Sequence, residues 1–109
     1  MSEPKASVSA AFQSFLQEAP KQAQAWMGAA RGLDEASALD AKTKHLAYLA
    51  VLAAQGLVSG VPFHADLARK AGATREEVVS AVLVGLPAAG NVVVAALPGA
   101  ISVFDDPAG

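Results

Sequence analysis

Residues 40–56, DAKTKHLAYLAVLAAQG, decide the fold of this chain. Asp40 is a good N-cap because its carboxylate can accept the free N–H groups of the first helical turn, and Gly56 is a typical helix stop. Apolar residues form one face of the helix between them and continue on the opposite face. The first face consists of Leu46, Leu49, Ala50 and Ala53, and the opposite one of Ala47, Val51 and Ala54. A helix that is apolar nearly all round is predicted to be buried.

Helical spacing of apolar residues extends to both sides of this segment. Thr74 and Glu77 form a capping box, Pro20 begins a helix and Gly32 ends it. Gly90 and Asn91 interrupt the apolar C-terminal stretch, and the β-branched run after them weakens the helical prediction there. We expect helices over residues 6–19, 21–31, 41–55, 61–71, 75–88 and 92–104, with a connector at 34–39. The chain is thus predicted to be an all-α, single-domain bundle of about six helices.

Composition excludes several classes of function. The chain has 109 residues, enough for one domain with a core, and 26 of them are alanine. It has no cysteine, which rules out disulfides, zinc–thiolate sites, iron–sulfur clusters and thiol chemistry. The net charge of −2 argues against a nucleic-acid surface. No dinucleotide-binding or phosphate-loop glycine pattern is present, so no cofactor is expected.

A membrane location is the alternative that the apolar stretches raise. No charged residue occurs over residues 78–104, a run of 27. This run is interrupted by Pro87, Gly90-Asn91 and Pro98-Gly99, and it is rich in small residues with no flanking Lys/Arg cluster. The first ten residues contain Glu3 and Lys5 and lack the apolar core of a signal peptide. We therefore expect no membrane association but a cytoplasmic homo-oligomer whose apolar helices are buried partly by other subunits.

Two histidines are the candidate groups for proton transfer. His45 lies early in the helix predicted to be buried, and His64 lies in the first turn of the next helix. Tyr48 is on the same helix face as His45, where it would either bind a ligand or fill the core. Each histidine has the alternative reading of a packing or surface residue. Two histidines without a third ligand of matching geometry do not predict a metal site.

The spacing of three segments resembles the carboxymuconolactone decarboxylase family, which includes the alkyl hydroperoxidase D branch. The segments are LDAKTK at 39–44, His64-Ala65, and GATREEV at 72–78, eight residues after His64. The resemblance covers residues 39–104 and leaves residues 1–38 as N-terminal helices within one domain, 1–109. It implies an all-α fold and an assembly into trimers or hexamers.

The sequence departs from the hydroperoxidase branch where that branch carries its redox groups. Leu57 and Gly60 occupy the positions of the Cys-x-x-Cys pair, Ser59 occupies a position that sometimes holds a histidine, and His45 replaces a glutamate. His64 alone remains of that proton-relay set. Peroxide reduction by that mechanism needs two thiols, so a thiol peroxidase is excluded by the chemistry.

The decarboxylase branch also lacks the cysteine pair and keeps the histidine. The resemblance therefore implies cofactor-independent, lyase-like chemistry on a small molecule, with His64 and His45 as catalytic residues and no metal. Tyr48, Leu57 and Gly60 are the residues expected to bind the substrate. An anionic substrate would need a cationic clamp, which a neighbouring subunit would have to help supply. The alternative is a catalytically inactive oligomer that keeps the fold as a binding or structural protein.

Overall fold

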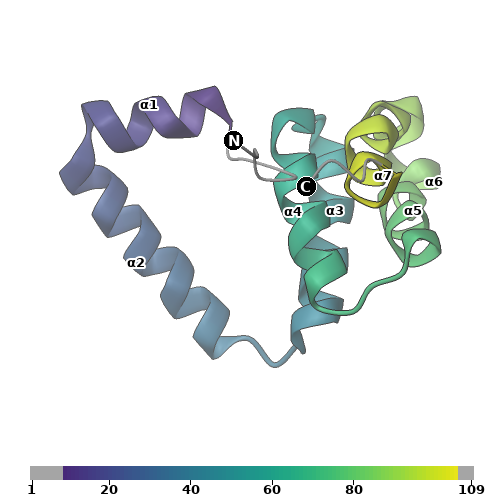
Figure 1. The fold of residues 1–109 in the computed structure, drawn as a ribbon, viewed down its shortest axis with the longest axis horizontal. Coiled ribbons are helices and arrows are strands. Elements are labelled where there is room, and N and C mark those ends of the chain that lie inside the picture. Colours follow the sequence, from purple (N-terminus) through teal and green to yellow (C-terminus); the bar gives the residue numbers. More distant parts are fainter. Residues whose placement is uncertain (1–8, 106–109) are drawn as a thin grey trace. The chain divides into compact units, whose positions relative to one another are not determined.

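A computed structural model describes residues 9–105, and this part of the chain is entirely helical apart from its connections. It divides into two compact units, residues 9–40 and residues 41–105 (Figure 1). The first unit contains α1 (Ala10–Glu18) and α2 (Pro20–Ala36). The second contains α3 (Ala41–Gln55), η1 (Val58–Gly60), α4 (Val61–Lys70), α5 (Arg75–Leu83), α6 (Leu86–Ala89), η2 (Gly90–Ala96) and α7 (Leu97–Asp105), where η marks a 3-10 helix. The predicted all-α class is confirmed.

In the first unit, two helices follow each other with a single residue between them. The Ser9 side chain caps α1 by accepting a hydrogen bond from the Phe12 N–H at 3.2 Å. The expected start at residue 6 lies outside the described residues. The predicted helix end at Gly32 is wrong, because α2 runs on to Ala36 and takes in part of the expected connector. Glycine lowers helix stability by only about 1 kcal/mol and can therefore lie inside a helix.

The second unit is organised around α3, whose predicted bounds are confirmed. This helix packs against α4, α5 and η2, and α7 packs against α4 and α5. Figure 1 shows α7, in yellow, close to α4 and α5. The interior is aliphatic and alanine-rich, which allows the helices to approach closely. It includes the buried residues Leu49, Leu52, Ala53, Val61, Ala65, Ala68, Val78, Val82, Val93, Ala96, Ala100 and Val103.

The side of α3 that faces away from this core is not covered within one chain. Tyr48 is 46% exposed and Val51 is 54% exposed. The predicted burial of α3 nearly all round therefore does not hold for a single chain. Burial of this side by other subunits stays a prediction.

Glycines end α3 and α4 as predicted. Gly56 and Gly72 have φ values of +73° and +101°, a left-handed backbone that favours glycine. At the end of α3, the Leu57 N–H donates to the Leu52 carbonyl at 2.9 Å and the Gly56 N–H to the Ala53 carbonyl at 3.1 Å. This pattern is a Schellman motif. The capping box of α5 is also confirmed, since Thr74 and Glu77 each accept a hydrogen bond from the backbone N–H of the other.

The C-terminal stretch differs most from the sequence prediction. Instead of helices over 75–88 and 92–104, the chain forms four shorter segments, α5, α6, η2 and α7. Prolines lie at the start of α6 and at the second residue of α7, and Gly90 turns the backbone with a φ of +80°. The β-branched residues 92–94 adopt the 3-10 conformation, consistent with their weak preference for an α-helix.

One helical stretch of the described residues, Arg75–Asp105, is long and apolar enough to cross a membrane by length and composition, with a mean hydropathy of 2.1 over an 18-residue window. In this fold it is not a continuous α-helix. Its longest α-helices, α5 and α7, have 9 residues each. Such a helix spans about 14 Å, whereas a bilayer core is about 30 Å thick. The stretch is a set of short helices packed on one another and on α3 and α4.

The contact between α4 and α7 depends on a glycine. A Cβ atom placed on Gly99 would lie 3.1 Å from Cγ and 3.3 Å from Cδ of Pro62. Both distances are shorter than an ordinary van der Waals contact. The missing side chain at Gly99 therefore allows the two backbones to approach each other here.

Candidate functional site

His64 lies in the first turn of α4 between two aromatic rings. Its imidazole is 4.4 Å from the Tyr48 ring, centroid to centroid, with the planes tilted by 44°. The Phe63 ring meets the imidazole edge-on at 5.4 Å. Tyr48 comes from α3, so the stack joins the two helices on which the candidate residues lie. His64 is half-buried, and Tyr48 lies on the exposed side of the pair.

His45 lies on α3 three residues before Tyr48, and its charge affects the pKa of His64. The pKa of His64 is lowered from its ordinary value of 6.5, first by burial and second by the electrostatic effect of His45. Both effects disfavour the imidazolium ion. His64 is therefore mostly neutral at neutral pH, the form that can accept a proton.

Gly60, just before α4, borders the same imidazole. A Cβ atom on Gly60 would lie 3.9 Å from Cδ2 of His64 and 3.7 Å from Cδ1 of Leu52. Its φ and ψ of −89° and −9° are open to any residue. Leu57 is 54% exposed. Its carbonyl oxygen accepts a hydrogen bond from the Gly60 N–H at 3.3 Å, which connects Leu57 to the residues around His64.

The structure thus brings together four of the five expected site residues, His45, Tyr48, Gly60 and His64, with Leu57 at the edge. Sequence reasoning did not include Leu52 and Phe63. Leu52 could have been found from its position four residues after Tyr48, because residues at that spacing share a helix face. Phe63 directly precedes His64, and nothing in the spacing distinguishes it from a core residue.

Four cations of the second unit are bound to carboxylates of the same unit. Arg69 donates to Asp66 through Nε at 3.0 Å and Nη2 at 2.7 Å, and Lys70 lies 3.2 Å from the same carboxylate. Lys42 pairs with Glu77 at 3.0 Å, and Arg75 pairs with Asp105 at 2.7 Å.

Asp66 is the buried member of these pairs. Burial alone would raise the pKa of its carboxyl group, but the hydrogen bonds from Arg69 and Lys70 outweigh that effect and lower it. Asp66 therefore remains ionised and holds both cations on α4.

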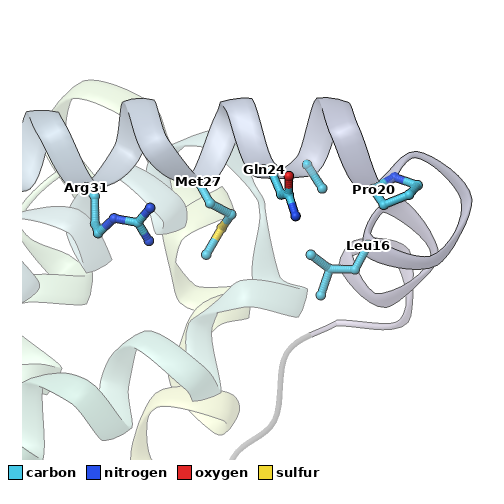
Figure 2. Close-up of a pocket in the computed structure, with 6 residues that line it drawn as sticks. Leu16, Pro20, Gln24, Met27 and Arg31 are labelled. Atoms are coloured by element: carbon cyan, nitrogen blue, oxygen red, sulfur yellow. The ribbon is translucent and has the colours of Figure 1, made fainter.

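Two grooves have no histidine among their lining residues. One, of about 380 Å³, runs between α3 and α5 and is lined by Leu46, Glu76, Glu77, Ser80, Ala81 and Val84. The other, of about 610 Å³, lies within the first unit and is lined by Leu16, Pro20, Ala23, Gln24, Met27 and Arg31. Figure 2 shows Gln24, Met27 and Arg31 pointing to the same side of α2.

No group of three or more His, Cys, Asp or Glu residues among residues 9–105 is placed to hold a metal ion. The chemistry available at His64 is that of an imidazole in contact with two aromatic rings, beside Gly60 and under the electrostatic influence of His45. These features define a small all-α protein without a thiol, whose candidate site is centred on a histidine.

A sequence model of the carboxymuconolactone decarboxylase family matches residues 20–101. The chain therefore belongs to this family, as the resemblance of its motifs predicted. The match begins at the first residue of α2 and ends within α7, so it includes α2 as well as the segment in which the resemblance was found. No curated protein and no solved structure matches the chain significantly.

Proposed function

We propose that this protein is a cofactor-independent enzyme of the lyase type, in which His64 transfers protons to and from a small molecule and His45 assists it. The observation that carries the proposal is the half-buried imidazole in contact with the tilted ring of Tyr48, with its pKa lowered so that the neutral base is available. A general base must be in its unprotonated form to accept a proton, and the lowered pKa keeps His64 in that form at neutral pH. The family supplies the reaction class, and the site supplies the group that would perform it.

The proposed chemistry uses one nitrogen of the His64 ring. The neutral imidazole accepts a proton from an acidic C–H or O–H group, and the resulting imidazolium returns a proton to carbon. If carbon dioxide is lost, the electron pair of the breaking C–C bond stays on the substrate, where the imidazolium delivers its proton. Protonated His45 makes protonation of His64 less favourable, so His45 tunes the base. A thiol peroxidase reaction is excluded because the chain has no cysteine.

The test follows proton exchange, so that no product needs to be known. Small lactones, ketones and carboxylic acids are incubated with the protein in D₂O, and loss of their C–H signals is followed by NMR. His64→Gln should slow the exchange of any active compound by about 100-fold or more. His45→Gln should have a smaller effect, and Tyr48→Phe, which keeps the ring and removes the hydroxyl, shows whether that hydroxyl takes part. Unchanged exchange in His64→Gln would overturn the proposed role.

A second candidate is an oligomer that has kept the fold and lost the chemistry. The observation that favours it is the set of exposed apolar side chains on the second unit. This set, called the apolar surface below, consists of Tyr48, Val51, Leu57, Val58, Val84, Leu86, Val92 and Val94. Exposed apolar area of this kind is common where subunits meet. We propose that the apolar surface contacts further copies of the chain, as trimers or hexamers in view of the family resemblance.

Light scattering after size exclusion tests the assembly. A mass several times the 11.0 kDa of one chain is expected. Val51→Glu should shift the mass toward the monomer, because it places a charge in the proposed interface. A monomeric wild-type protein would contradict the assembly. An assembled protein without proton exchange would favour the structural candidate. Binding of a small molecule, a cytoplasmic location and the lack of nucleic-acid or membrane partners stay predictions.

A further inference from the structure

We infer that the molecule bound at His64 is uncharged, a planar carbonyl compound rather than a carboxylate. The inference rests on the proposed function in one respect: it takes the surroundings of His64 to be the place where a small molecule binds. It goes further because the family name points to a lactone that carries a carboxyl group, whereas the surroundings of this imidazole favour a neutral ligand.

Apart from the imidazole of His45, which acts on His64 electrostatically, the groups placed next to His64 carry no charge. The rings of Tyr48 and Phe63 contact the imidazole, Gly60 lies beside it, and the methyl groups of Leu52 lie next to Gly60. A planar carbonyl compound can stack on a ring and exchange a hydrogen bond with the imidazole. A carboxylate loses its hydration at such a surface. The cost in free energy is offset only where a cation or several N–H donors bind the carboxylate oxygens.

The cations of the second unit are already engaged. Lys42, Arg69, Lys70 and Arg75 each form an ion pair with a carboxylate of the same unit. Drawing Arg69 or Lys70 toward a ligand would also remove a partner from the buried carboxylate of Asp66, which is costly. Lys44 lies four residues before Tyr48 and takes part in an interaction of its own. Lys44 is the cation that the experiment must examine separately.

An uncharged ligand changes which lyase-type step is expected at His64. Loss of carbon dioxide starts from a bound carboxylate, so a neutral ligand favours proton removal from the carbon next to a carbonyl group. A neutral imidazole is suited to that step, since it takes up the proton without meeting a second negative charge.

The experiment compares benzamide and benzoate, which share size and planarity and differ in charge. Both are titrated at neutral pH into the full chain, and the ring C–H signals of the two histidines are followed by NMR. Benzamide should shift the His64 signals with an affinity about tenfold higher than that of benzoate. Equal or tighter binding of benzoate would overturn the inference, and so would the absence of binding by both.

A cation placed next to His64 should reverse the preference. Gly60→Lys is compatible with the backbone at this position, and Gly60→Met is the matched neutral control of similar length. Gly60→Lys should strengthen benzoate binding about tenfold relative to Gly60→Met, with benzamide unchanged. Lys44→Gln should change neither ligand in the wild-type background. If Lys44→Gln abolishes benzoate binding in that background, Lys44 is the clamp and the inference is wrong.

The two proposals fail in different ways. Ligand binding is measured without turnover, so a preference for benzoate overturns the uncharged ligand and leaves the proton-transfer role of His64 intact. Unchanged proton exchange in His64→Gln overturns that role and leaves the ligand preference intact.

Discussion

The two units of the chain differ in whether each encloses a hydrophobic core. Residues 41–105 enclose a set of buried aliphatic side chains, whereas Ala23 is the buried residue among residues 9–40. Trp26 and Leu33 of the first unit are 58% and 72% exposed. Both units are helical, so helix formation alone does not account for the difference. Short helices gain most of their stability from the surface they pack against, and only the second unit supplies that surface itself.

Two leucines give the sharpest test of this difference. Leu49→Ala in α3 should lower the free energy of unfolding by about 2–5 kcal/mol, because it leaves a cavity in the core. Leu33→Ala in α2 is the matched change at an exposed position and should shift it by less than about 0.5 kcal/mol. Urea denaturation followed by circular dichroism measures both. A large loss in Leu33→Ala would mean that the exposed face of α2 is covered in solution.

Two glycines provide the next test. Gly99→Ala places a methyl group against Pro62 at the contact of α4 with α7, and should destabilise the protein by about 1–3 kcal/mol. Gly28→Ala in α2 meets no atom within 4 Å and should stabilise the helix by about 0.5–1 kcal/mol. Thermal unfolding of both variants measures the sign and the size of the change in stability that each substitution causes. Equal effects would show that packing at Gly99 is looser than described.

The pH dependence of stability gives the smallest effect. His64 has a pKa below 6.5 in the folded state, so below pH 6.5 the unfolded chain binds more protons than the folded one. The contribution of His64 to the free energy of unfolding is present in full above pH 6.5. It is lost as the pH falls through the pKa of His64 in the folded state. His64→Gln should remove this loss, which sets in near pH 6.5 and grows as the pH falls; urea denaturation at a series of pH values measures it.

Carboxylates provide the internal control when the free energy of unfolding is measured as a function of pH. Asp66, Glu77 and Asp105 have lowered pKa values, so their contributions are lost at more acidic pH, below ordinary values of 3.8 for Asp and 4.5 for Glu. His64→Gln should leave this acidic loss unchanged. The same slope above pH 5 in wild type and variant would contradict the lowered pKa of His64.

The sequence predicted the fold where local chemistry determines it. The bounds of α3, the glycine ends at Gly56 and Gly72, and the capping box at Thr74 all follow from interactions within a few residues. The helix end expected at Gly32 was wrong because glycine only weakens a helix. The division of residues 75–105 into four segments depends on how they pack on α3 and α4, which local spacing does not contain.

The candidate site was predictable in its residues and less so in its surroundings. The family motif singled out His64, and helix spacing placed Tyr48 with His45. The stack of Tyr48 on His64 joins two helices, so it depends on tertiary packing. The engagement of Lys42 and Arg75 with acids 35 and 30 residues away likewise could not be found from spacing along one helix.

The apolar stretch of α5 to α7 also bears on how the chain is made. A nascent segment that contains an 18-residue window with a mean hydropathy of 2.1 is attractive to membranes and to other unfolded chains as long as it stays exposed. Its packing partners α3 and α4 precede it in the sequence, so they have already left the ribosome when it emerges. Synthesis from the N-terminus therefore provides a docking surface before the most aggregation-prone part of the chain is complete.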